Sequence, residues 1–245
     1  MFTRKVTMNR TTMFLLLSVL GLGAMSNAVD LSFSGNPYGT HQPMLYAVAN
    51  NTTGAVIEFG CGFGSTDLLH EVCKQTGRVL VTLEDDLDWL NQFREKYKND
   101  GYKEDNSGWH KMYFVPGKKE NPDRESPSHW VNFFESLELL RTMSFDVCFI
   151  DQSPWLARYE TIKLMKDKVR YVVLHDCDYF PAHGIFGSVI KHIDRMKSIP
   201  GIFDFSDVFQ HSKVYFPPLP WAGDTGPPTL VGSNFDDNFL EMIQQ

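Results

Sequence analysis

The sequence lacks an excess of basic residues. It has 23 Lys and Arg against 30 Asp and Glu, for a formal net charge of −7. Nucleic-acid binding needs a cationic surface that neutralises phosphates, so this balance argues against such a partner. No pair among the 4 cysteines has CxxC spacing, which argues against a structural zinc site. No internal repeat is evident, and no apolar run reaches the roughly 20 residues that a membrane-spanning helix needs.

The first 28 residues have the order of a secretory signal peptide. Residues 1–10 carry three basic residues and no acid, residues 13–25 are largely apolar, and Ser26–Ala28 are small or polar. We expect cleavage before Val29, a location in the secretory pathway or otherwise outside the cytoplasm, and no stable membrane span afterwards. An uncleaved signal anchor is the alternative. Loss of three positive charges would take the net charge from −7 to −10.

After this leader, short apolar runs alternate with amphipathic ones. Such alternation predicts strands and helices in turn, and near-continuous apolar strands indicate a parallel sheet that is covered on both faces. Residues 29–245 are therefore expected to form a single α/β domain, with a Rossmann-like doubly wound, mostly parallel sheet. We expect strands at 55–60, 78–84, 111–117, 145–151 and 169–176, helices at 65–77, 86–101, 129–143, 157–167 and 184–201, an antiparallel hairpin at 202–218, and a Pro/Gly-rich surface tail from about 217.

The candidate catalytic and ligand-binding residues directly follow the expected strands. In open α/β sheets, ligands bind at the carboxyl ends of the strands, near the point where the strand order reverses. Acidic, glycine and histidine side chains should therefore gather at one edge. They are Gly60, Gly62 and Gly64 after the first strand, Glu84 after the second, Asp151 after the fourth, and His175 and Asp176 after the fifth.

The glycines lie where a ligand could approach the backbone before a helix begins. Glu84 comes 20 residues after Gly64, where such folds place an acid that accepts the ribose hydroxyls of a nucleotide. A dinucleotide fingerprint needs a third glycine at position 65, which is Ser65 here. The pattern E-x-G-x-G-x-G thus favours S-adenosylmethionine over NAD, and an NAD-dependent oxidoreductase is a weaker hypothesis. Glu58 inside the strand either contacts the ligand or braces the glycine turn.

Four segments together resemble one family. "VIEFGCGFG", "VTLEDDLDWL", "FDVCFIDQS" and "VVLHDCD" are similar, in this order, to motifs of the class I S-adenosylmethionine-dependent methyltransferases, over roughly residues 40 to 180. The resemblance implies that Glu58, Gly60, Gly62 and Gly64 form the methionine side of the cofactor pocket and that Glu84 holds the ribose. The family's adenine-contacting acid after the third strand has no clear counterpart near "FVPGKKENPD".

Methyl transfer to oxygen needs a general base or a divalent metal that acidifies the hydroxyl. In catechol-type O-methyltransferases the metal ligands follow the fourth and fifth strands, and the resemblance assigns these positions to Asp151 and Asp176. Their third ligand, an Asn, is Cys177 here, and a thiolate suits softer metals than Mg²⁺. His175 is a base, a ligand, or a histidine bonded to a neighbouring carboxylate. Asp151 and Asp176 are otherwise helix and turn caps.

The resemblance implies an O-methyltransferase that uses S-adenosylmethionine, with a divalent metal as an option. "HDCD" is also similar to the strand end of plant glucuronoxylan O-methyltransferases, which suggests a carbohydrate hydroxyl as acceptor; a small-molecule hydroxyl is the other choice. The candidate catalytic residues are Asp151, His175 and Asp176. The alternative is a secreted, non-catalytic binding module that keeps the fold.

Overall fold

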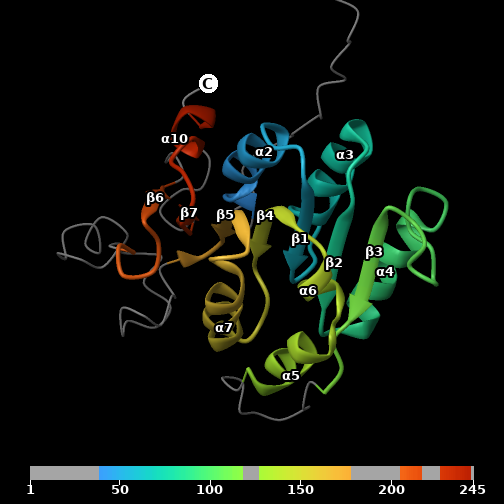
Figure 1. The fold of residues 1–245 in the computed structure, drawn as a ribbon. Coiled ribbons are helices and arrows are strands. Elements are labelled where there is room, and N and C mark those ends of the chain that lie inside the picture. The colour runs from blue at the N-terminus through green and yellow to red at the C-terminus, as the bar shows by residue number, and fades with distance from the viewer. Residues whose placement is uncertain (1–38, 118–126, 178–204, 217–226, 244–245) are drawn as a thin grey trace, which may run out of the picture. The chain divides into compact units, whose positions relative to one another are not determined.

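The computed structural model describes residues 39–117, 127–177, 205–216 and 227–243. The predicted leader and the predicted helix at 184–201 lie outside these ranges. The described residues contain a sheet flanked by helices (Figure 1). The strands are β1 Ala55–Phe59, β2 Leu80–Glu84, β3 His110–Phe114, β4 Phe145–Ile150, β5 Val169–Leu174, β6 His211–Tyr215 and β7 Thr229–Ser233. The helices are α2 Gln42–Asn50, α3 Thr66–Thr76, α4 Leu87–Tyr97, α5 Ser128–Ser136, α6 Leu139–Thr142, α7 Trp155–Met165 and α10 Phe239–Met242.

The sheet has seven strands in the order β3-β2-β1-β4-β5-β7-β6. The first five strands of the chain pair in parallel, and β7 pairs antiparallel with both β5 and β6. The predicted Rossmann-like, mostly parallel sheet with an antiparallel pair at its C-terminal edge is confirmed. Because β2 and β4 flank β1, the strand order reverses at β1, where a ligand site is expected.

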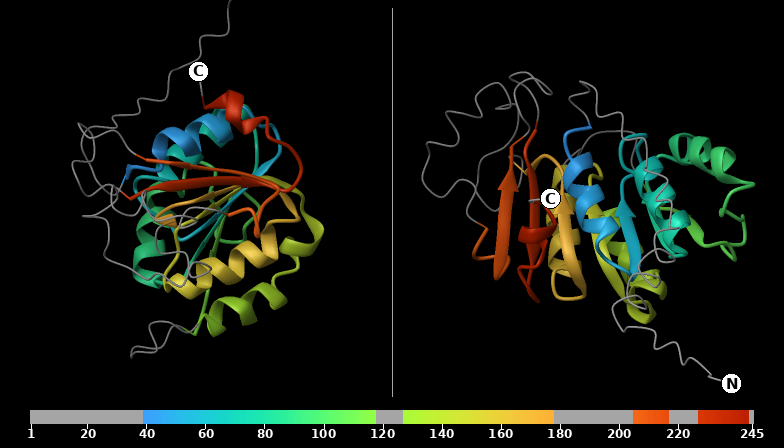
Figure 2. Two further views of the ribbon diagram at one scale, coloured as in Figure 1. Left: turned by 90° about the vertical axis from the view of Figure 1, so that its left-hand side faces the viewer. Right: turned by 90° about the horizontal axis from the view of Figure 1, so that it is seen from above.

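Helices cover both faces of the sheet (Figure 2). On one face α2 and α3 pack on each other, while α7 packs with α5 on the other face. The caps follow the sequence: the Asp86 side chain accepts a hydrogen bond from Trp89 N at 3.0 Å, and Gly77 ends α3 in a left-handed conformation. None of the described helices is long and apolar enough to cross a membrane. All four cysteines lie in the described ranges, are buried and form no disulfide.

Two local predictions were wrong. The helix predicted at 129–143 is broken into α5 and α6, because Leu137 between them has an extended backbone. Of the hairpin predicted at 202–218, the described residues 205–216 contain a single strand, β6. Its partner β7 comes from the expected surface tail and is buried along its whole length between β5 and β6. A strand buried on both faces shows no polar alternation, so the short run Thr229–Ser233 gives little signal in sequence.

The ends of β1 and β4 approach each other closely at Gly60. Its φ is +85°, and a methyl group on its Cα would lie 2.7 Å from Gln152 N and 2.8 Å from the Asp151 carbonyl carbon. Gly60 is therefore required both by its backbone conformation and by its contact with the chain after β4.

We predict that Gly60→Ala lowers the free energy of unfolding by about 2 kcal/mol or more, because alanine adds left-handed strain and a backbone clash. Gly62→Ala is the matched control, since its methyl group would come no nearer than 3.7 Å to Ser65 Oγ. Urea denaturation measures both variants. Equal losses in the two would contradict the close contact at Gly60.

Candidate functional site

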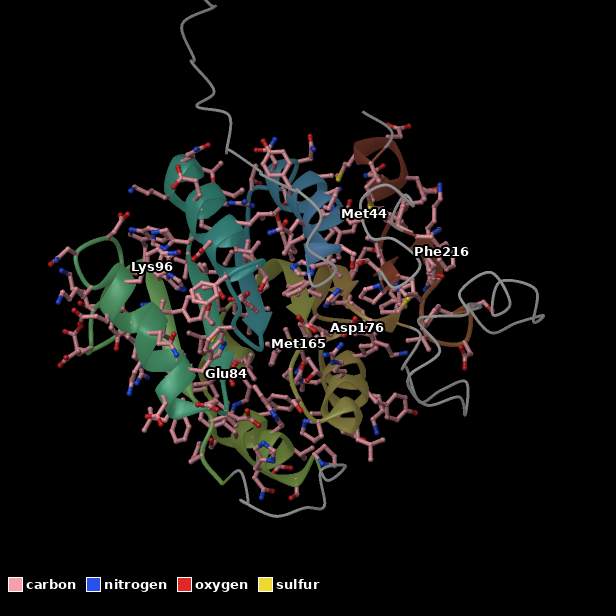
Figure 3. All side chains as sticks on the ribbon, turned by 180° about the vertical axis from the view of Figure 1, so that it is seen from behind. Met44, Glu84, Lys96, Met165, Asp176 and Phe216 are labelled. Atoms are coloured by element: carbon pink, nitrogen blue, oxygen red, sulfur yellow. The ribbon has the colours of Figure 1, made fainter. Side chains whose placement is uncertain are left out.

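The glycine turn after β1 touches both neighbouring strand ends. Gly60 packs on the backbone of Asp151 and Gln152 after β4, and Cys61 N donates a 2.8 Å hydrogen bond to Glu84 Oε2 at the end of β2. Figure 3, which views the molecule from behind, labels Glu84 at the end of β2 and Asp176 just after β5. The predicted convergence of strand ends is thus present, with the glycine turn between Glu84 on one side and Asp151 on the other.

Glu84 is buried and already accepts several hydrogen bonds. Its Oε1 accepts from Asp85 N at 2.9 Å and from Asp86 N at 2.8 Å, in addition to the bond from Cys61 N to Oε2. Burial raises the pKa of Glu84 above its ordinary value, against the lowering effect of these N–H groups. A carboxylate has about four lone-pair sites, so three bonds leave room for one more strong donor.

Glu58 lies under the turn and is fully buried. The Thr66 hydroxyl is 3.1 Å from Oε1 and 3.0 Å from Oε2, and Thr82 Oγ1 donates to Oε2 at 2.9 Å. Thr66 Oγ1 also accepts a hydrogen bond from Gly62 N at 2.9 Å. Glu58 therefore stabilises the glycine turn through Thr66 and connects β1 to β2 through Thr82.

The bonds around Glu58 continue towards the surface. Thr82 Oγ1 is 3.0 Å from His110 Nε2, and His110 Nδ1 is 2.9 Å from His70 Nδ1. His70 Nε2 lies 3.5 Å from the exposed carboxylate of Asp100. Burial lowers the pKa of both histidines, so each is a neutral ring that can donate at one nitrogen and accept at the other.

Asp151, His175 and Asp176, the three predicted catalytic residues, lie together. Asp151 Oδ1 is 3.2 Å from His175 Nδ1, and Asp176 Oδ1 is 3.5 Å from His175 Nε2. Asp176 has φ +52°, an uncommon conformation for a residue other than glycine. His175 is buried, whereas Asp151 is partly exposed.

Arg158, from α7, is the cation between the two carboxylates. Its Nη2 lies 2.8 Å from Asp151 Oδ1 and its Nη1 3.3 Å from Asp176 Oδ2. Burial alone would raise the pKa of Asp151, but the charges of His175 and Arg158 outweigh it and hold that pKa below its ordinary value. For His175, burial lowers the pKa, and the charges of Asp151 and Asp176 overcome this and raise it.

The Mg²⁺ ligand set suggested by the sequence, Asp151 with Asp176, fits this arrangement poorly. A guanidinium already supplies the positive charge that two neighbouring carboxylates require. Cys177, at the position of the third ligand, is 1% exposed and its N–H donates to Pro228 O at 3.1 Å. We therefore do not assign a metal ion to Asp151 and Asp176 as a pair.

Two residues that the sequence analysis did not single out belong to this site. Arg158 lies one turn into the helix after Asp151, and an excess of acids at one edge is the signal that could have found it. His41, just before α2, is buried beside the glycine turn: a methyl group on Gly64 would lie 3.4 Å from His41 Nε2. Its ring centroid is 4.4 Å from that of His175. No local sequence pattern around His41 indicates this position.

No family model matches the chain, and no curated protein matches it. Solved structures that resemble it include an O-methyltransferase from Bacillus cereus in complex with SAH, at 14% identity over 90% of this chain and 88% of that one, with a TM-score of 0.47. A spermidine synthase from Thermotoga maritima is 17% identical over 82% of this chain and 60% of that one, with a TM-score of 0.45. An RNA methyltransferase from Salinibacter ruber in complex with S-adenosyl-L-homocysteine is 13% identical over 58% of this chain and 76% of that one, with a TM-score of 0.36. At these identities the similarity concerns the fold, and the function rests on the residues of this chain.

Because Glu58 is buried, we expect the free energy of unfolding to depend on pH. Burial raises its pKa from 4.5 to about 8, against the lowering effect of the Ser65, Thr82 and Thr66 hydroxyls, and the charge of Glu84 adds to the rise. Between these values the folded protein holds a proton that the unfolded chain has released. The free energy of unfolding therefore falls as pH rises through this window.

We predict that Glu58→Gln reduces this fall by about 2–4 kcal/mol between about pH 5 and pH 8, because the amide does not titrate. Urea denaturation across this range measures it. Glu95→Gln is the control, since Glu95 is exposed on α4. The same slope in Glu58→Gln as in the wild type would refute a protonated Glu58.

Proposed function

We propose that this protein binds S-adenosylmethionine and transfers its methyl group to a hydroxyl of a small-molecule or carbohydrate acceptor. One observation carries the proposal. The glycine turn after β1 is hydrogen-bonded to Glu84 on one side and packed against Asp151 on the other. Glu84, the proposed nucleoside-binding acid, thus lies on one side of the glycine turn, and the proton-accepting groups of Asp151 and His175 lie on the other.

The cofactor would lie across the carboxyl end of β1. Glu84 has capacity for one more strong hydrogen bond, which suits one ribose hydroxyl; the sequence analysis had assigned it both. The backbone at Gly62 and Gly64 lets the methionine part approach the start of α3. Glu58 supports this turn from below through Thr66 and, on its contacts, acts through the turn rather than on the ligand.

Transfer requires the acceptor oxygen to attack the methyl carbon while the bond from that carbon to sulfur breaks. The sulfur leaves as a neutral thioether, and the hydroxyl proton must go to the protein or to water. Asp151 and His175 are assigned to this deprotonation, because they lie 3.2 Å apart next to the glycine turn and both can accept a proton there. Asp176 and Arg158 position them. His175 keeps two of the three roles that the sequence left open, proton acceptor and metal ligand.

The second candidate is the non-catalytic binding module. The observation in its favour is Arg158, which pairs with Asp151 and with Asp176. The charges of His175 and Arg158 lower the pKa of Asp151 and make it a weak base. The enzyme requires cofactor binding and turnover, whereas the binding module requires only that turnover is absent.

We predict that Glu84→Gln weakens S-adenosylmethionine binding at least about tenfold, because a charge-assisted hydrogen bond contributes about 1.5–3 kcal/mol. Isothermal titration calorimetry on the folded protein measures it. Gln replaces Glu here because its amide oxygen still accepts from the N–H groups of Asp85 and Asp86, which donate to one oxygen of Glu84. Glu95→Gln is again the exposed control. Binding of NAD in preference to S-adenosylmethionine, or unchanged affinity in Glu84→Gln, would remove the proposed pocket.

For turnover, Asp151→Asn and His175→Gln are each expected to lower kcat by about 100-fold or more, with cofactor affinity retained. The assay measures S-adenosylhomocysteine formed with phenolic and sugar-hydroxyl acceptors. Asp237→Asn, an exposed carboxylate near α10, is the control. Wild-type binding without turnover on any acceptor would favour the binding module. Full activity in both site variants would contradict the assigned deprotonation.

A further inference from the structure

His41 is a buried imidazole whose ring nitrogens make no well-formed hydrogen bond with the described residues. It is 2% exposed, and neither of its ring nitrogens has a partner among the residues that the structure describes. Its ring lies against Phe149 on one side, at 4.8 Å between centroids, and against His175, at 4.4 Å. A buried imidazole with two unpartnered nitrogens is unfavourable unless something binds to it.

The hydrogen bonds of Thr40 determine which nitrogen of His175 carries a proton. Thr40 Oγ1 donates its only hydrogen to Pro227 O at 2.9 Å. Towards His175 Nε2, at 3.2 Å, the same oxygen must therefore accept, and Nε2 must be the donor. Nδ1 faces Asp151 Oδ1, 3.2 Å away: in the charged ring it donates a proton to this carboxylate, and in the neutral ring it presents its lone pair. A metal ion that binds here takes the place of the proton between the imidazole and the carboxylate.

The donor atoms of three residues meet at this point. One nitrogen each from His41 and His175 and one carboxylate oxygen of Asp151 all lie within 4.8 Å of one another. We propose that His41, Asp151 and His175 form a binding site for a divalent transition-metal ion, with two imidazoles and one carboxylate as protein ligands. This set favours ions such as Zn²⁺, Co²⁺ or Fe²⁺ over Mg²⁺, which prefers oxygen.

The surroundings have the character of an outer shell around a metal centre. Ligating histidines usually donate their other N–H to an oxygen, which fixes the ring, and His175 Nε2 is placed to do so to Thr40. Ligating carboxylates are usually hydrogen-bonded too, and Arg158 holds Asp151 Oδ1 at 2.8 Å. The proposal differs from the ligand pair predicted from sequence, because His41 and His175 take the place of Asp176.

The site lies beside Gly64, at the same edge as the proposed cofactor pocket. A divalent ion bound there would lower the pKa of a hydroxyl that it contacts. His175 is then a ligand, one of its two open roles. Metal binding does not depend on methyl transfer, so it is tested without S-adenosylmethionine. A protein that binds metal but no cofactor, or cofactor but no metal, separates the two proposals.

The test is a titration of chelator-treated, full-length protein with Co²⁺, followed by its visible d–d absorption, with competition by Zn²⁺ and by Mg²⁺. We expect one Co²⁺ per chain, displaced by Zn²⁺ and not by an equal concentration of Mg²⁺. His41→Gln should weaken Co²⁺ binding at least about tenfold. His129→Gln is the matched control, because His129 also pairs with a carboxylate, Asp85, at 2.9 Å. It should bind like the wild type.

Absence of saturable Co²⁺ binding by the wild type would overturn the proposal, as would equal affinity in His41→Gln. Circular dichroism establishes that each variant is folded. If His41→Gln does not fold, X-ray absorption of the wild-type Co²⁺ complex decides the matter. Two imidazole ligands would support the site, and fewer than two would overturn it.

Discussion

The guanidinium of Arg158 is the interaction on which the candidate site depends. Its Nε donates to Gln152 O and its Nη1 to His175 O, both at 2.8 Å, and its Nη2 donates to Asp151 O at 3.1 Å. The same group lies against the carboxylates of Asp151 and Asp176. One side chain thus joins the chain after β4 to the chain after β5. Removal of such a partner leaves two partly buried acids unpaired, which is a destabilising change.

The sequence was sufficient for the parallel part of the sheet and for the edge at which the chemistry gathers. A chain of near-continuous apolar strands, each followed by an amphipathic helix, has few stable folds other than a doubly wound sheet. Parallel strands place their carboxyl ends on one side, so Glu84, Asp151 and His175 could be expected together without knowledge of any contact. The wrong predictions, the 202–218 hairpin and the unbroken 129–143 helix, concern segments without clear periodicity or with a break inside it.

The partners within the site could not be predicted, because they come from distant parts of the chain. His41 reaches His175 from before α2, and Thr40 bonds to Pro227 across 187 positions. Nothing in the local pattern of either segment depends on the other. The buried His110 and His70 likewise look unremarkable in sequence and only in the fold connect Glu58, through Thr82, with Asp100.

The left-handed backbone of Asp176 has a consequence for how densely charge can be placed at a strand end. Along a regular strand, successive side chains point to opposite faces, so neighbouring residues cannot serve the same site. At Asp176 the chain leaves this alternation, and two consecutive side chains come within 3.5 Å of each other. Glycine would adopt the conformation with less strain but would carry no carboxylate. The left-handed conformation of Asp176 therefore costs about 1 kcal/mol of backbone strain and places a second carboxylate beside the same imidazole.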